Sequence, residues 1–294
     1  MNDAAQAHGV RRERTDVAVV GGGPAGLAAA IELRRLGVTR VVVLEREREA
    51  GGVPRHTDHT GFGLRDLHRC LRGPRYAARY RALAAAAGVD VRTMTTVAAW
   101  AGPHTLALTA PSGRVELSAD AIVLASGCRE RPRAARRVAG DRPRGVLTTG
   151  ALQQMVTLHR QPVGRRAVVV GAEHVSFSAV LTLAHAGAAT VAMVTEQPRH
   201  QSYAALAWLA AARRRVPVLT RSRVEVIRGR QRVEAGGHGP FGVQSTDFVK
   251  RAARRRADAS PVALARSAGS RKRRPDSPSP CRCTRRTCCS RPNR

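Results

Sequence analysis

The sequence predicts an α/β fold with two doubly wound parallel sheets, and three observations support this prediction. Between residues 16 and 230, short β-branched apolar runs alternate with segments of helical length and period. A glycine-containing turn closes the first apolar run of each half, at Gly21 and at Gly171. After Ala235 the alternation ends, and the remaining residues are rich in Arg, Ser and Pro. Two α/β units followed by a disordered C-terminal tail are therefore expected.

The expected elements alternate along the chain. Strands are predicted at residues 16–20, 40–45, 121–126, 167–171 and 191–196, and helices at 25–36, 76–87, 150–159, 175–186 and 203–214. A hairpin is predicted over 105–115, with its turn at residues 111–113. The predicted regions are a disordered N-terminus (1–14), an incomplete first domain (15–149), an inserted second domain (150–235) and a disordered basic tail (236–294).

The formal net charge of +30 over 294 residues is the extreme feature of the composition. Such a basic excess suggests binding to nucleic acid or to an anionic surface. Nearly all of it is Arg, since Lys250 and Lys272 are the only lysines. Because Ala, Gly and Pro are also abundant, GC-rich coding explains the excess better than a specific nucleic-acid partner does.

Membrane insertion and secretion are not predicted. Residues 1–14 are polar, and no apolar run reaches the roughly 18 residues of a membrane span. Six cysteines without a signal segment do not indicate a disulfide framework. A cytoplasmic location is the expectation.

The first glycine turn, Gly21 to Gly26, has the spacing of a dinucleotide-binding site. Gly21 allows a tight turn, Gly23 lets the backbone approach a pyrophosphate, and Gly26 lets the helix pack on the strand. Pro24 and Ala25 begin a helix whose N-terminus faces the phosphates. At the end of the next strand, Glu45 is placed to accept hydrogen bonds from a ribose.

Further motifs give this Rossmann-type unit a family resemblance. Glu45 is followed by Arg46 and then by the pair Gly51-Gly52, and a later strand ends in Ala125-Ser126-Gly127. The chain resembles flavoproteins of the pyridine nucleotide-disulfide oxidoreductase type, in which FAD occupies the first of two dinucleotide folds. The resemblance implies FAD contacts at Gly21, Gly23, Pro24, Ala25, Gly26, Glu45, Arg46, Gly51, Gly52, Ser126 and Gly127.

Two other stretches, 129–133 and 145–154, are similar to the FAD subunits of dye-linked amine and amino-acid dehydrogenases, such as opine oxidase and hydrogen cyanide synthase. This implies an FAD-dependent oxidoreductase. Its small-molecule substrate, an amine, an amino acid or a related compound, would give hydride to the flavin. An electron-acceptor subunit is the implied partner. No catalytic residue can be assigned from the sequence.

The second glycine turn lacks the middle glycine. Gly171 is present, but Glu173 and Ser176 stand where the second and third glycines are expected. A carboxylate there repels phosphate, so weak or absent NAD(P) binding is predicted, although Glu196 remains at the ribose position. The alternative is a shifted loop that still binds NAD(P)H, which would make the protein an NAD(P)H-dependent flavin reductase.

The remaining chemistry-bearing residues give no predicted metal site and no thiol mechanism. Cys70 and Cys128 form no closely spaced pair, and the cysteines at 281–289 lack zinc-site spacing. His56, Asp58 and His59 could bind a metal, but a polar loop near the flavin is preferred, with Arg55 or His56 facing the ring.

The segment after Ala235 lacks the Gly-Asp or Gly-Asn pair that the resemblance requires to complete the FAD site. Our hypothesis is a frameshift near residues 235–242, which would leave this chain inactive; translating the other two frames tests it. The alternative is a genuine basic tail. A non-enzymatic, nucleic-acid-binding product would then bind phosphate through residues 250–256 and 271–274 without reading sequence.

Overall fold

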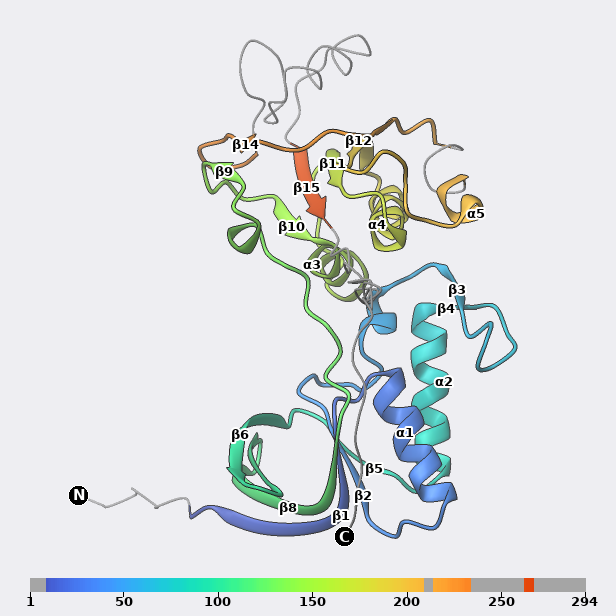
Figure 1. Ribbon diagram of the computed structural model, residues 1–294, viewed down its shortest axis with the longest axis vertical. Helices are drawn as coiled ribbons and strands as arrows, with labels where there is room; N and C mark the ends of the chain where they lie inside the picture. The colour runs from blue at the N-terminus through green and yellow to red at the C-terminus, as the bar shows by residue number, and fades with distance from the viewer. Residues whose placement is uncertain (1–8, 209–213, 234–261, 267–294) are drawn as a thin grey trace, which may run out of the picture.

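The computed structural model describes residues 9–208, 214–233 and 262–266, the last of these as backbone only. Two parallel-rich sheets lie at opposite ends of the elongated molecule (Figure 1). The chain crosses between them after β8 and makes a second contact through the segment that follows β2.

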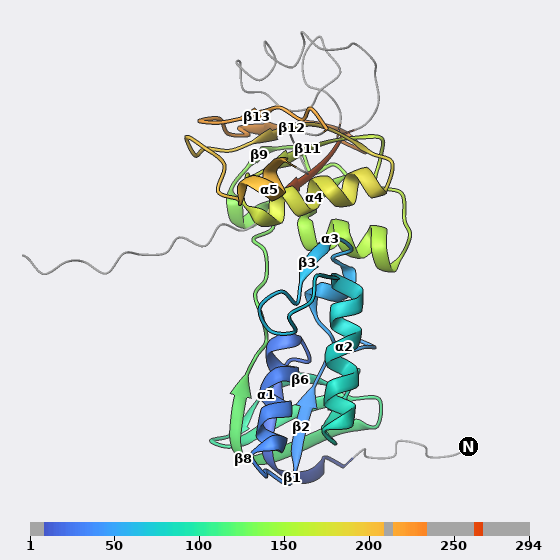
Figure 2. The same cartoon turned by 90° about the vertical axis from the view of Figure 1, so that its right-hand side faces the viewer.

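The first sheet has the strand order β5-β2-β1-β8-β7-β6. Its strands are β1 (Arg11–Val20), β2 (Val41–Leu44), β5 (Asp90–Arg92), β6 (Thr96–Gly102), β7 (Thr105–Ala110) and β8 (Gly113–Leu124). Helices α1 (Pro24–Arg35) and α2 (Gly73–Ala86) lie side by side on one face (Figure 2). On the opposite face, the antiparallel strands β6, β7 and β8 of the same sheet pack against β1 and β2.

Each face of this sheet has its own apolar core. Leu27 and Ala30 of α1 pack with Val19 and Val43 beneath the helices. On the other face, buried residues of β1, β2, β7 and β8 form a second cluster: Ala18, Val42, Leu44, Leu106, Leu108, Val115, Leu117 and Ala119. Apolar side chains on both faces are typical of a parallel sheet covered on both sides.

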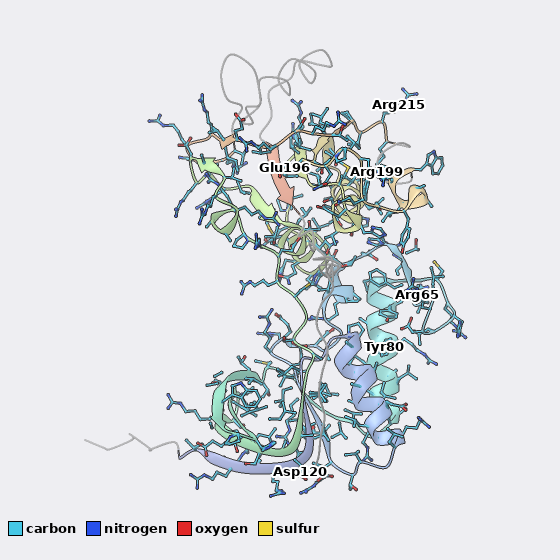
Figure 3. All side chains as sticks on the ribbon, viewed as in Figure 1. Arg65, Tyr80, Asp120, Glu196, Arg199 and Arg215 are labelled. Carbon is cyan, nitrogen blue, oxygen red and sulfur yellow. The ribbon has the colours of Figure 1, made fainter. Side chains whose placement is uncertain are left out.

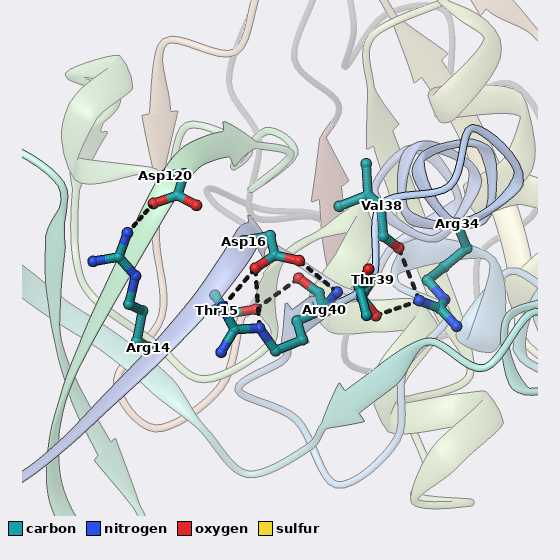
Figure 4. Close-up of polar contacts among 8 residues, drawn as sticks. All are labelled: Arg14, Thr15, Asp16, Arg34, Val38, Thr39, Arg40 and Asp120. Carbon is teal, nitrogen blue, oxygen red and sulfur yellow. Dashed lines mark hydrogen bonds and ion pairs between the residues drawn. The ribbon is translucent and has the colours of Figure 1, made fainter.

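A polar network fixes β2 beside β1. Asp16 accepts hydrogen bonds from the backbone N–H and the guanidinium of Arg40, and Thr15 Oγ1 donates to Arg40 O at 2.8 Å (Figure 4). The bond from the Arg40 N–H, followed by the guanidinium, holds the pKa of Asp16 below its ordinary value. On the far side of β1, Arg14 pairs with Asp120 of β8 at 2.7 Å.

β8 has two different halves. Residues 113–118 pair with β7 on one side, and from Val115 onward they also pair with β1 on the other. Residues 120–124 continue along β1, and the described part of the chain places no strand on their other side. Leu124 at the end of this edge is 67% exposed.

The second sheet has the order β10-β15-β11-β12-β13, all parallel. These strands are β10 (Val146–Thr148), β11 (Arg166–Val170), β12 (Ala189–Val194), β13 (Val218–Leu219) and β15 (Val262–Arg266). The helices are α3 (Thr149–Gln153), the π-helix η3 (Gln154–Leu158), α4 (His174–His185) and α5 (Ala204–Ala207).

Short elements complete the described chain: the 3₁₀ helices η1 (Val53–His56) and η2 (Ala134–Arg136), the pair β3 (Thr60–Phe62) and β4 (Leu71–Arg72), and the pair β9 (Ala139–Gly140) and β14 (Val226–Ile227). No helix within the described ranges has the length and apolar character needed to cross a bilayer.

The α/β class, the alternation of elements and the hairpin at 111–113 are confirmed, with bounds that differ at several ends. β1 starts five residues before the predicted strand, and the strand predicted over 121–126 is the end of β8, which starts at Gly113. The helix predicted over 150–159 is observed as α3 followed by the π-helix. The helix predicted over 203–214 begins as α5, and residues 209–213 lie outside the described residues. The prediction that no strand forms after Ala235 is wrong for residues 262–266, which form β15 between β10 and β11. The rest of that segment lies outside the described residues.

Candidate functional site

The first glycine turn joins β1 to α1, and its geometry excludes side chains at two positions. A Cβ on Gly26 would lie 1.9 Å from Gly21 O, so α1 packs directly on the turn as predicted. A Cβ on Gly21 would lie 2.4 Å from Ala125 O, and Gly21 has a φ of +110°. Gly21 therefore serves both the turn and the close approach of β8, and the sequence had indicated only the turn.

Gly23 stands in open space. A Cβ there would meet nothing nearer than Gly52 Cα at 3.9 Å. Gly23 is also the N-cap of α1, which has no side-chain cap, no acidic residue in its first turn and Pro24 as its first residue. Free N–H groups at an uncapped helix N-terminus form an anion site, so a phosphate fits here.

The Gly51-Gly52 pair closes the other side of the turn. Gly51 N donates to Gly22 O at 2.6 Å, and a Cβ on Gly52 would lie 2.9 Å from Gly23 Cα. Both glycines have positive φ, +121° and +58°, which other residues rarely adopt. The pair thus forms part of the cradle wall.

Glu45 lies at the carboxyl end of β2 and is only 7% exposed. Its Oε2 accepts from Gly22 N at 3.0 Å and its Oε1 from Glu47 N at 2.9 Å. A carboxylate offers about four lone-pair positions, so Glu45 can still accept from a ribose hydroxyl. Its bond to Gly22, which sequence reasoning missed, also holds the glycine turn in place.

The other predicted contact residues lie at the surface. Arg46 has a side chain that is 69% exposed, with Glu47 as an ionic neighbour at 3.5 Å. Ser126 and Gly127 are exposed and directly follow Ala125, whose N–H donates to Val20 O. The structure thus brings Gly21, Gly23, Gly26, Glu45 and the Gly51-Gly52 pair together, with Ser126 and Gly127 following the strand beside them. It does not place Arg46 in contact with the turn.

The second glycine turn has a different arrangement. Glu173 is the N-cap residue of α4, and its Oε2 accepts a hydrogen bond from Ser176 Oγ at 2.9 Å. Ser176 is fully buried. The two residues that replace glycines are therefore partners, and they put a carboxylate at the helix N-terminus where a pyrophosphate would bind. This arrangement disfavours a dinucleotide phosphate at the turn.

A cavity of about 530 Å³ lies at this turn, along the carboxyl ends of β11 and β12. Its lining includes Gly171, Glu173 and the predicted ribose ligand Glu196. Glu196 is exposed and opens the loop that also carries Arg199 (Figure 3). The cavity lies where a doubly wound sheet binds a nucleotide. Unlike the first turn, it has a carboxylate, that of Glu173, at the helix N-terminus.

The segment after Gly52 contains the polar residues that the sequence analysis considered for a metal or the flavin. Asp58 is paired with Arg72 at 2.7 Å, and His59 bonds to Thr60 O and Ser178 Oγ, both at 2.8 Å. Arg55 packs along Gly51, with its Nε 3.7 Å from Glu49. Asp58 and His59 therefore have hydrogen-bond partners in the protein, whereas the buried Nε of Arg55 has no hydrogen-bond partner among the described residues.

His56 in the same segment is 6% exposed. Burial, with a smaller contribution from the charge of Arg55, lowers the pKa of His56 to about 4. The ring is therefore neutral near pH 7. Cys70 and Cys128, in contrast, are exposed free thiols, while the cysteines at 281–289 lie outside the described residues.

Glu130 joins the two stretches on which the narrower resemblance rests. Its carboxylate accepts hydrogen bonds from Thr149 N at 3.3 Å and Gly150 N at 2.7 Å, at the start of α3. A carboxylate is favourable at a helix N-terminus, so Glu130 anchors the crossing segment to α3. The spacing of the two motifs gave no signal of this contact.

The fold and the first site define a class of protein with two dinucleotide-type folds, the first of which carries an open glycine turn. The chain belongs to the pyridine nucleotide-disulphide oxidoreductase family, whose family model matches residues 15–247. The open turn at Gly23, the uncapped N-terminus of α1 and the ribose acceptor Glu45 fit FAD.

Relatives of known name support this assignment. The chain is 32% identical over 188 residues to sarcosine oxidase subunit alpha of Corynebacterium sp., covering 59% of this chain and 18% of the relative. It is 36% identical over 119 residues to hydrogen cyanide synthase subunit HcnB of Pseudomonas protegens, covering 38% and 24%. The chain thus matches a quarter or less of the length of these relatives.

Solved structures show the same fold. L-proline dehydrogenase from P. horikoshii superposes with a TM-score of 0.60 at 16% identity, over 89% of this chain and 43% of that one. Thioredoxin reductase of Lactococcus lactis gives a TM-score of 0.62 at 15% identity, over 87% and 77%.

Proposed function

We propose that the protein oxidises an amine, an amino acid or a related small molecule by hydride transfer to FAD bound at the first glycine turn. The observation that carries this proposal is the contrast between the two turns. Gly23 leaves the N-terminus of α1 open, whereas Glu173 places a carboxylate at the N-terminus of α4. A site that disfavours NAD(P)H leaves the organic substrate as the source of hydride.

In this proposal the chain's own residues position the cofactor. The backbone from Gly21 to Gly26, with Pro24 and Ala25 in the first turn of α1, holds the pyrophosphate. Glu45 holds the ribose, and the backbone at Ser126 and Gly127 runs beside the flavin nucleotide. FAD supplies the hydride acceptor when it is bound. The described residues do not identify a catalytic base.

The substrate class and the partner rest on the relatives. One relative acts on sarcosine by its name, and a structure of the same fold acts on L-proline by its title. Both sarcosine oxidase alpha and HcnB are named as subunits. We therefore expect a small amine or amino acid as substrate and a second subunit as electron acceptor.

Anaerobic mixing of the FAD-reconstituted chain with sarcosine, L-proline, NADH or NADPH tests the proposal. We expect loss of flavin absorbance with an amine substrate and little change with either nicotinamide. Faster reduction by NADH or NADPH than by any amine would overturn the proposal in favour of an NAD(P)H-dependent flavin reductase.

The variant Gly23→Glu is the matched control for cofactor binding. It copies the Glu173 arrangement into the first turn, and the open space around Gly23 allows the side chain to fit. We expect this variant to fold and to lose FAD, because its carboxylate repels the pyrophosphate. Equal FAD binding by Gly23→Glu and the unmodified chain would show that the cofactor lies elsewhere.

A further inference from the structure

Four polar side chains connect the two halves of the molecule, and we name them the clasp: Thr57, His59, Gln153 and Ser178. Thr57 and His59 follow η1, Gln153 ends α3, and Ser178 lies in α4. Thr57 Oγ1 is 3.1 Å from Gln153 Oε1, and Gln153 Nε2 is 2.8 Å from Ser178 Oγ. Ser178 Oγ is in turn 2.8 Å from His59 Nε2. Thr57, Gln153 and Ser178 are each at most 5% exposed.

Counting hydrogens fixes the direction of this chain when His59 is neutral. Thr60 O can only accept, so the single ring proton is on Nδ1, which donates to Thr60 O at 2.8 Å. Nε2 is then an acceptor, so the Ser178 hydroxyl donates to it and accepts from Gln153 Nε2. Thr57 has one hydrogen but two acceptors, Gln153 Oε1 and Val53 O at 3.0 Å. In the neutral clasp, the single Thr57 hydrogen is therefore shared between these two contacts.

A protonated His59 reverses the direction without breaking a contact. Both ring nitrogens then donate, Nδ1 to Thr60 O and Nε2 to Ser178 Oγ. The Ser178 hydrogen then needs a new acceptor. Among the partners of Ser178 Oγ in the described residues, Gln153 can supply one by rotating its amide, which presents its oxygen to Ser178 and its NH₂ group to Thr57. The two orientations of an amide have nearly the same shape. Thr57 then gives its hydrogen to Val53 O, and every contact has its own hydrogen.

We propose that the clasp is a proton-linked positioning device, in which the charge of His59 sets the orientation of the Gln153 amide and hence the direction of the hydrogen bonds that join the two halves. It does not depend on the substrate or cofactor proposed above. Histidine is the side chain whose charge ordinarily changes near neutral pH.

The groups around His59 leave its charge free to act on the clasp. Asp58 is neutralised by Arg72 on the β4 side, and the ring of Phe62 in β3 lies 5.4 Å from the His59 ring centroid. α3 contains no titratable residue. In α4 the titratable residues are His174, which bonds to Gln201 O and makes an edge-to-face contact with Tyr203, and His185 at its last turn. His56 stays neutral above about pH 4 because burial lowers its pKa.

Side-chain NMR of the full chain, with histidine and glutamine labelled, tests the proposal. We expect the ring signals of His59 and the amide signals of Gln153 to change with pH at one common midpoint. A Gln153 amide that does not follow the His59 titration would overturn the proposal, and this measurement needs no variant.

The variant Gln153→Glu provides a second test. A carboxylate only accepts, so Ser178 must donate to it and must accept from His59 Nε2. We expect the His59 midpoint to rise by about one pH unit, which is a tenfold gain in proton affinity. Gln154→Glu adds the same charge to the neighbouring residue outside the clasp and is expected to shift the midpoint much less.

The double variant Gln153→Glu with Ser178→Ala separates the hydrogen-bond chain from simple charge. It keeps the carboxylate but removes the hydroxyl that links it to the ring. We expect its midpoint to match that of Gln154→Glu. Equal shifts in Gln153→Glu and Gln154→Glu would show that charge alone acts, and would overturn the clasp as a proton-linked device.

Discussion

Replacing Glu173 by glutamine is expected to improve binding of a dinucleotide at the second turn. Glutamine keeps an oxygen for the 2.9 Å contact with Ser176 Oγ but removes the negative charge at the N-terminus of α4. Two like charges about 4 Å apart in an effective dielectric of about 20 repel by roughly 4 kcal/mol, which is about a thousandfold in Kd. Because Glu173 is only partly buried, salt screens part of this repulsion. We expect a gain of about tenfold to a hundredfold at physiological salt and a larger gain at low salt.

Titration calorimetry of the full chain with NADH and NADPH measures this effect. The unmodified chain should bind either nucleotide with a Kd of about a millimolar or weaker, in line with the repulsion estimated above. Glu173→Gly should also tighten binding, at a stability cost of about 1 kcal/mol for the lost bond to Ser176. Asp120→Asn, an exposed residue on β8 of the other sheet, is the control for nonspecific loss of charge. Micromolar binding by the unmodified chain, or no gain in Glu173→Gln beyond that in Asp120→Asn, would refute the reasoning.

Three further predictions concern the cofactor, His56 and β15. Heat-released cofactor should be FAD rather than FMN, because the Gly21–Gly26 turn and Glu45 serve an ADP moiety. The FAD content should be well below one per chain, because the edge of β8 at residues 120–124 has no partner strand in the described chain. Chromatography that recovers FMN, or a stoichiometric yellow protein, would contradict these expectations. Because the pKa of His56 is lowered to about 4 in the folded chain, the unfolded chain binds this proton first as pH falls. The contribution of His56 to the free energy of unfolding is therefore complete above about pH 6.5 and decreases toward pH 4 by at most about 3 kcal/mol. Denaturant unfolding of His56→Leu should show a weaker acid dependence, and a pH profile identical to that of the unmodified chain would rule this out. A chain that stops after residue 266 should keep the melting temperature of the full chain, whereas one that stops after residue 261 lacks β15, exposes the edges of β10 and β11 and should melt several degrees lower.

The sequence predicted the first glycine turn well because its determinants are local. The run Val17–Val20, the three following glycines and the helix after Pro24 lie within one continuous stretch. Each glycine has a steric reason that a chemist can infer from the motif alone. Glu45 could be placed for the same reason, since it ends the next strand. Its second role, as acceptor for Gly22 N, depends on how the turn folds back on β2 and left no trace in the spacing.

β15 could not be predicted because the strand is defined by its neighbours. Val262-Ala-Leu-Ala-Arg266 is a short apolar run inside a segment rich in Arg, Ser and Pro. It becomes a strand by pairing with Val146–Thr148 and Arg166–Val170, which lie about a hundred residues earlier in the chain. Strand propensity depends strongly on such tertiary context. The clasp was missed for the same reason, because its contacts join residues up to 119 positions apart.

The two sheets repeat one topology, and this repetition isolates what distinguishes their sites. In the first, β2 and β8 flank β1, and β5 lies outside β2; in the second, β12 and β15 flank β11, and β13 lies outside β12. Each central strand leads into a turn and then a helix of 12 residues, α1 or α4. Since the backbone framework and the helix dipole are shared, any difference in phosphate affinity between the two sites is expected to come from the turn residues. Gly23 exposes the N–H groups of α1 to an incoming anion, and Glu173 supplies α4 with a carboxylate of the protein's own. Glu173 in place of the second glycine, held by Ser176 in place of the third, is therefore our reason to expect a dinucleotide phosphate at the first turn and weak binding at the second.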